Sequence, residues 1–62
     1  MKQILWCCVD TNFDNPNYYF ETLSYRRFES ILRLKGTTKL EWEEHKKMGW
    51  KCIKVEVTIK PI

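Results

Sequence analysis

Apolar and polar residues alternate most regularly near the end of the chain. Residues 53–60 read IKVEVTIK, so every odd position is apolar and every even position is polar. A period of two over this length is typical of a strand with one face on a core and one face in water. We therefore expect Ile53, Val55, Val57 and Ile59 to face the helices of the fold, and Pro61 to block continuation of the strand.

Two further strands are predicted near the start of the chain. Residues 2–9, KQILWCCV, form a nearly unbroken apolar run of the kind found in buried central strands. Residues 10–17, DTNFDNPN, are turn formers with Phe13 as the exception, and they predict a loop. Residues 18–22, YYFET, are rich in rings and predict a second strand that returns beside the first.

In the middle of the chain, apolar residues recur at the spacing of an α-helix. In residues 25–35, YRRFESILRLK, one stripe is predicted to face the core. Its members are Tyr25, Phe28, Ile31, Leu32 and Lys35. Ser24 is the expected N-cap of this helix, and Gly36 is expected to end it.

A second helix is predicted over residues 40–48, LEWEEHKKM. Thr38 and Glu41 have the T-x-x-E spacing of a capping box, which marks a helix start. Gly49 is expected to end this helix, with Trp50 as the apolar residue that follows. The Trp42 side chain lies far round the helix from Leu40, so it is either exposed or closes the other side.

These elements give the order β-β-α-α-β. The predicted fold is α+β, a three-stranded, mostly antiparallel sheet with a helical layer on one face. With 62 residues, the chain is expected to form one domain over 1–62, and the order of the strands in the sheet stays open.

Composition adds a surplus of rings. Three tryptophans, three tyrosines and three phenylalanines are more than so small an interior hides easily, so some rings should reach the surface. The adjacent Cys7 and Cys8 point to opposite faces of a strand, and we expect reduced, buried thiols. No signal peptide or membrane span is recognisable, so the expected location is cytoplasmic and no membrane association is expected.

One segment carries a metal-binding pattern. Asp10, Asn12, Asp14 and Glu21 occupy the first, third, fifth and twelfth positions of a stretch that resembles the calcium loop of the EF-hand family, and the resemblance implies that these four would be its ligands. Asn15 replaces the glycine of the sixth position, and a strand precedes the loop where the family has a helix. A hairpin loop rich in Asp and Asn explains the same residues, so we expect no bound calcium.

Zinc and catalytic chemistry have less support. Cys7, Cys8, His45 and Cys52 are suitable elements for a zinc site, but neither C-x2-C nor H-x3-H spacing occurs. His45 is expected to be a solvated helical residue, and thiols in the core are inert. No glycine-rich phosphate loop is present. We therefore expect neither an enzyme nor a cofactor.

The basic residues raise the possibility of nucleic-acid binding. The net charge is +3, and Arg26, Arg27, Arg33 and Lys35 lie on the first predicted helix, where they could neutralise phosphates. The second predicted helix mixes glutamates with lysines, which is typical of a solvated face. Nucleic-acid binding is therefore the alternative hypothesis.

Protein binding is the main hypothesis. Exposed rings beside arginines are typical of interfaces, which points to Tyr25, Arg26, Arg27 and Trp42 as contact residues for an unidentified protein. A small, ring-rich chain without a catalytic motif is similar to the accessory proteins of phages and mobile elements that inhibit or redirect a host protein, and this similarity transfers no residues. A homodimer is also expected, through the edge of the sheet or an aromatic patch.

Overall fold

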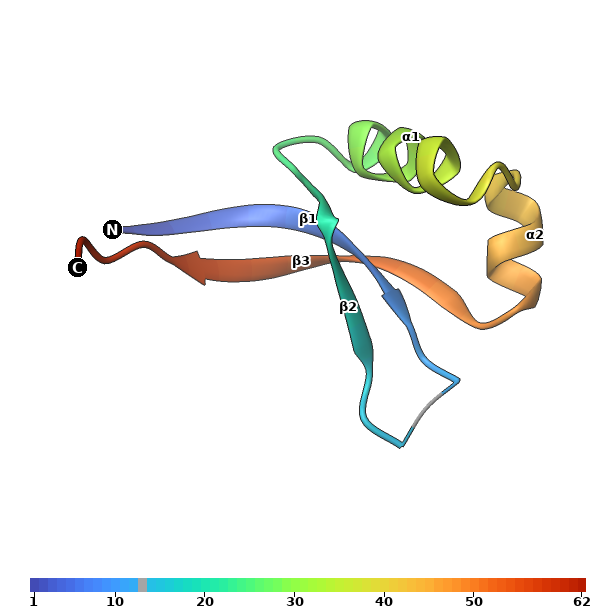
Figure 1. Cartoon of the computed structure of the whole chain (residues 1–62), viewed down its shortest axis with the longest axis horizontal. Coiled ribbons are helices and arrows are strands. Elements are labelled where there is room, and N and C mark those ends of the chain that lie inside the picture. The colour runs from blue at the N-terminus through green and yellow to red at the C-terminus, as the bar shows by residue number, and fades with distance from the viewer. Residues whose placement is uncertain (13) are drawn as a thin grey trace.

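Three strands and two helices make up the computed structural model of this chain, which describes residues 1–12 and 14–62 (Figure 1). Phe13, in the predicted loop, lies outside the described residues. The elements are β1 (Lys2–Asp10), β2 (Asn17–Ser24), α1 (Arg27–Thr38), α2 (Trp42–Lys47) and β3 (Trp50–Thr58). The predicted order β-β-α-α-β and the α+β class are confirmed.

The sheet has the order β2-β1-β3, and both pairings are antiparallel. The apolar run of the first strand is therefore central, as predicted. The β1–β3 ladder runs without interruption from the pair Lys2–Thr58 to the pair Asp10–Trp50. Beyond it, the amino group of Met1 donates to the carbonyl of Ile59 at 3.0 Å, so the two ends of the chain lie side by side (Figure 1).

The helices pack on one face of the sheet, and the contacts of two cysteines identify that face. Cys8 pairs directly with Cys52, and the Cys8 thiol lies 3.4 Å from the hydroxyl of Ser30 on α1. Leu34 and Trp50 complete this core with Cys8. Because side chains alternate along a strand, the even positions of β1 and β3 face the helices.

The prediction that the apolar odd positions of β3 face the helices is therefore wrong. Ile53, Val55 and Val57 lie on the opposite face of the sheet, where they line a groove with Cys7. Ile59 lies beyond the end of β3 and is 50% exposed. The alternation correctly identifies two chemically different faces. It carries no information about which face the helices cover. Here the helices pack against Cys52 and Trp50, on the face opposite Ile53, Val55 and Val57.

Helix α1 packs through a different stripe from the predicted one. Ser30 and Leu34 are fully buried and Ile31 is half-buried, whereas Phe28 and Leu32 are 54% and 58% exposed. The small side chain of Ser30 lies against the Cys8 thiol, so the helix approaches the sheet through small groups rather than through rings. The spacing predicted a helix correctly, but Phe28 and Leu32 of the predicted stripe face solvent.

The first helix also begins and ends differently from the prediction. Ser24 is the last residue of β2, and Arg26 precedes α1 without a side-chain cap. The helix runs through Gly36 to Thr38, and Lys39 takes the left-handed conformation at φ 65°. The predicted glycine stop at Gly36 is therefore wrong.

The capping box is wrong for a related reason. Thr38 belongs to α1, and its hydroxyl donates to the Leu34 carbonyl at 3.1 Å instead of capping the next helix. Helix α2 begins at Trp42 after Glu41, which provides no side-chain cap. The prediction for Gly49 is confirmed, because it follows α2 with a φ of 94°.

Within residues 1–12 and 14–62, neither helix has the length and apolar character needed to cross a membrane.

Candidate functional site

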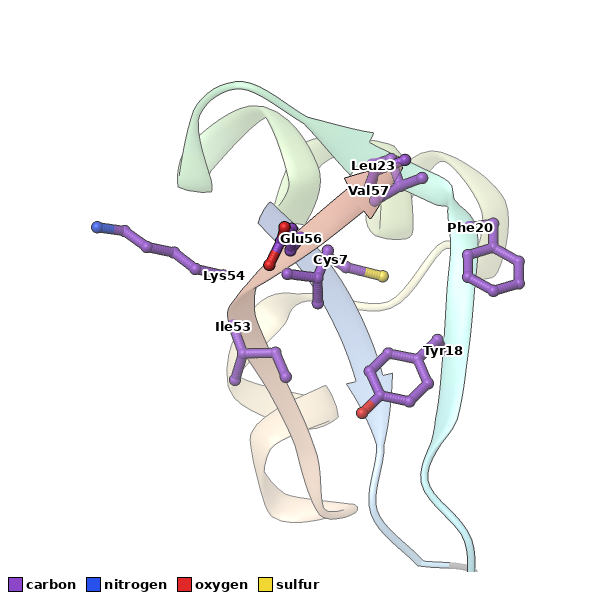
Figure 2. A pocket seen from close by; sticks show the side chains of 9 residues that line it. Cys7, Tyr18, Phe20, Leu23, Ile53, Lys54, Glu56 and Val57 are labelled. Carbon is purple, nitrogen blue, oxygen red and sulfur yellow. The ribbon is translucent and has the colours of Figure 1, made fainter. Parts of the chain in front are cut away.

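An apolar groove of about 430 Å³ lies on the face of the sheet opposite the helices (Figure 2). All three strands contribute to it. Its lining residues are Cys7, Tyr18, Phe20, Leu23, Ile53, Lys54, Val55, Glu56 and Val57. The Lys54 side chain points away from the hollow in Figure 2, so its charge lies outside the apolar surface.

An irregularity in β2 builds one wall of the groove. In the β1–β2 ladder, Trp6 pairs with Ser24 and Cys8 pairs with Tyr19. Two steps along β1 therefore oppose five steps along β2, and residues 20–23 bulge out of the regular ladder. A bulge of this kind redirects side chains locally. Here it supplies the groove with Phe20 and Leu23.

Thr22 holds this bulge in place. The main-chain N–H of Cys8 donates to the Thr22 hydroxyl at 2.9 Å. That hydroxyl in turn donates to the Tyr19 carbonyl at 2.6 Å. Thr22 is fully buried, and its oxygen therefore satisfies a main-chain donor inside the sheet.

The groove has a buried floor and an exposed aromatic rim. Cys7 is 1% exposed, whereas Tyr18 is 41% and Phe20 is 72% exposed. Burial raises the pKa of the Cys7 thiol, so the floor is neutral rather than nucleophilic. A hollow with mostly apolar walls is suited to binding by shape and hydrophobic contact.

The structure brings together two of the four residues predicted to contact a partner, Arg27 and Trp42. Tyr25 is 70% exposed, and its hydroxyl donates to the Gln3 side chain at 3.3 Å. Arg26 and Arg27 are exposed at the start of α1, but the Arg27 guanidinium lies 5.9 Å from the centre of the Trp42 ring. Trp42 is half-buried and packs against the core, so it closes the far side of the fold.

The basic residues of the nucleic-acid hypothesis are dispersed. At 3.6 residues per turn, Arg27, Arg33 and Lys35 lie on different sides of α1, and Arg26 precedes the helix with an extended backbone. Lys35 is already paired, with its amino group 2.8 Å from a carboxylate oxygen of Glu41. These four side chains therefore do not lie in one row along the helix.

The elements of the zinc pattern are also separated. Cys7 lines the groove, whereas Cys8 and Cys52 lie on the helix face of the sheet. His45 is 1% exposed, so the expectation of a solvated residue is wrong. Its ring nitrogens form hydrogen bonds with the Glu41 carbonyl at 2.9 Å and with the Thr38 hydroxyl at 2.8 Å. His45 is therefore a buried link between the two helices.

Two residues of the calcium pattern have structural partners of their own. A carboxylate oxygen of Asp10 accepts hydrogen bonds from the main chain and the side-chain amide of Asn12. The same amide donates to the carbonyl of Met48 at the end of α2. Asp14 and Glu21 are exposed. Within the described ranges 1–12 and 14–62, no cluster of three or more His, Cys, Asp or Glu side chains is arranged to hold a metal ion.

Sequence reasoning missed Tyr18, Phe20 and Leu23 as functional candidates. A signal was available, because Tyr18 and Phe20 are two residues apart in the predicted second strand and therefore share a face. The position of Leu23 had no such signal, since it depends on the bulge at Thr22.

No protein-family profile, no curated protein and no solved structure matches this chain.

Proposed function

We propose that this chain is a small, non-enzymatic protein-binding module, and that the groove on the open face of its sheet receives apolar side chains of a partner protein. The observation that carries the proposal is the concave apolar surface lined by Phe20, Ile53 and Val55. Large exposed apolar patches mark interaction sites, and rings in such patches dominate interface energies.

The chemistry of the polar groups agrees with a binding role. One hydroxyl–imidazole pair does occur, between Thr38 and His45. His45 is buried between the rings of Trp42 and Trp50, and the Thr38 hydroxyl also contacts the Leu34 carbonyl. A nucleophile and its base need access to a substrate, so this pair is better explained as the link that holds α1 against α2.

Paired substitutions at two exposed phenylalanines test the function. Phe20→Asp places a charge in the groove, whereas Phe28→Asp places the same charge on the outer face of α1, 54% exposed. We expect a partner captured from nuclease-treated lysate to bind the unmodified chain and the Phe28→Asp variant, and to bind the Phe20→Asp variant at least tenfold more weakly, because a central ring contributes about 2 kcal/mol or more. Far-UV circular dichroism should show that both variants fold.

Two results would refute the proposal. Loss of every partner after nuclease treatment would favour nucleic-acid binding through α1. If the Phe20→Asp variant captures the partner as well as the unmodified chain does and the Phe28→Asp variant does not, the binding surface is the outer face of α1.

A further inference from the structure

In the described part of the chain, the outer edge of β3 pairs with no other strand, because β3 is the last strand of the β2-β1-β3 sheet. Met1 and Ile59 exchange both main-chain hydrogen bonds, at 3.0 and 2.8 Å, and Thr11 donates to Gly49 in the same register. In an antiparallel ladder such bonded pairs recur at every second residue. The odd residues of β3 therefore bond to β1, and the even residues direct their main-chain N–H and C=O groups toward the free edge.

We infer that this edge pairs with the same edge of a second copy of the chain, giving a homodimer with one continuous six-stranded sheet. In the favoured register, the two-fold axis passes through Val55, so that Lys54 of each copy lies opposite Glu56 of the other. Both residues direct their main-chain groups outward, so each such pair exchanges two hydrogen bonds. Opposite charges directly across a ladder stabilise the pairing.

Charge complementarity selects this register over its neighbours. A shift of two residues one way places Lys54 opposite Lys54 of the second copy, and a shift the other way places Glu56 opposite Glu56, both of which are destabilising. A shift of one residue would set the apolar face of one copy against the charged face of the other. The register through Val55 is the one that combines matched faces with matched charges.

Neighbouring contacts on the same face extend the charge pattern. Within one copy, Glu56 already lies 3.3 Å from the Lys2 amino group, and the Lys54 amino group lies over the Trp6 ring at 5.5 Å. The second copy would add an opposite charge on the free side of both residues. Lys54 and Glu56 are therefore spaced along the edge so that each would lie opposite the other in a copy related by the two-fold axis.

The apolar face agrees with the same register. Across the axis, Val55 meets Val55 of the second copy, and Ile53 meets Val57, so β-branched side chains pair on the open face. The two grooves then become one hollow that crosses the axis. This inference rests on the edge of β3 and stands whether or not the groove binds a partner protein.

Sedimentation of the full chain with charge variants is the main test. We expect a dimer, with twice the 7.6 kDa mass of the chain, at micromolar concentration. Lys54→Glu or Glu56→Lys alone should raise the dissociation constant about tenfold or more, because symmetry applies each like-charge contact twice. The double variant, which restores opposite charges, should return the constant to within a few-fold of the original. Lys47→Glu on α2 makes the same charge change away from the edge and should have no effect.

Cross-linking tests the register. In a chain with Cys52→Ser, Val55→Cys should form a disulfide-linked dimer on mild oxidation, since non-bonded pairs across a ladder lie about 4.5 Å apart. Val57→Cys is the matched control, because it lies opposite Gln3 in its own chain and its two copies would be about 14 Å apart at about 3.4 Å per residue. Any of three results overturns the inference: a clean monomer, a dimer indifferent to both single charge variants, or cross-linking by Val57→Cys but not by Val55→Cys.

Discussion

A single hydroxyl group has a disproportionate role in this sheet. Thr22 is buried in the bulge of β2, where its oxygen accepts a hydrogen bond from the Cys8 N–H. The bulge in turn brings Phe20 and Leu23 to the groove. The stability of the sheet and the shape of the candidate site therefore depend on the same side chain.

Removing that hydroxyl gives a sharp prediction. Thr22→Val keeps the volume but removes the hydroxyl that accepts from the buried Cys8 N–H, which costs about 1–3 kcal/mol of the free energy of unfolding. Thr22→Ser keeps the oxygen and should lose clearly less. Urea denaturation followed by tryptophan fluorescence measures both values, and equal stability of the valine variant and the original chain would show that the hydrogen bond contributes nothing.

Cys52 gives a prediction about pH. Burial, the largest cause, raises the pKa of its thiol from the ordinary value of 9.0 to about 11. The folded chain therefore favours the neutral thiol, so the stability that this group contributes is present in full below pH 9 and is lost as the pH rises toward 11. The rate of alkylation by iodoacetamide, followed by mass spectrometry of the Cys52 peptide, should keep rising through this window. A rate that levels off near pH 9, as in the denatured chain, would contradict the assignment.

At the residue scale, the sequence indicated strand geometry more reliably than burial. The divergence of Cys7 and Cys8 to opposite faces is confirmed, because alternation along a strand is a local property. The burial of His45 could not be foreseen, since its two partners come from the end of one helix and the start of the next. The role of Thr22 was hidden for the same reason.

At the scale of elements, the two glycines have opposite roles. Gly49 has a φ of 94°, and a β-carbon built there would lie 2.7 Å from the side-chain oxygen of Asn12. Gly36 lies inside α1 with nothing within 4 Å of the equivalent position. One glycine is required by the turn into β3, and the other only weakens a helix.

Alanine at each glycine should therefore change stability in opposite directions. Gly49→Ala introduces both backbone strain and a clash, and we expect a loss of at least about 1 kcal/mol. Gly36→Ala should raise the free energy of unfolding by about 0.5–1 kcal/mol, because alanine favours the helical conformation. Parallel thermal melts compare the two. A stabilised Gly49→Ala variant would contradict the structure of this turn.

The elements themselves were predicted well, and their boundaries were not. Periodicity along the chain identified three strands and two helices in the right order, because it follows directly from local geometry. The start of α2 was missed because Thr38 uses its hydroxyl on the preceding turn of α1. The covered face of β3 was missed because no pattern within a strand says where a helix elsewhere in the chain will pack.

Over the whole molecule, the apolar side chains are divided between a thin core and two exposed regions, the groove and the outer face of α1. The fully buried cluster rests on Cys8, Leu34 and Trp50, while Phe20 and Phe28 remain largely in water. The expectation that some rings reach the surface is confirmed. Composition alone indicated this surplus, but only the bulge in β2 and the rotation of α1 decide where the exposed rings lie.

The side-by-side ends of the chain have a mechanical consequence. Met1 and Ile59 close the open end of the β1–β3 ladder and are 58 positions apart in sequence. A force that pulls the two ends apart acts across this ladder, so it breaks one bonded pair after another instead of loading all of them at once. The chain should therefore unzip at low force from its ends, and the helices lose the strand beneath them only when the opening reaches Cys52.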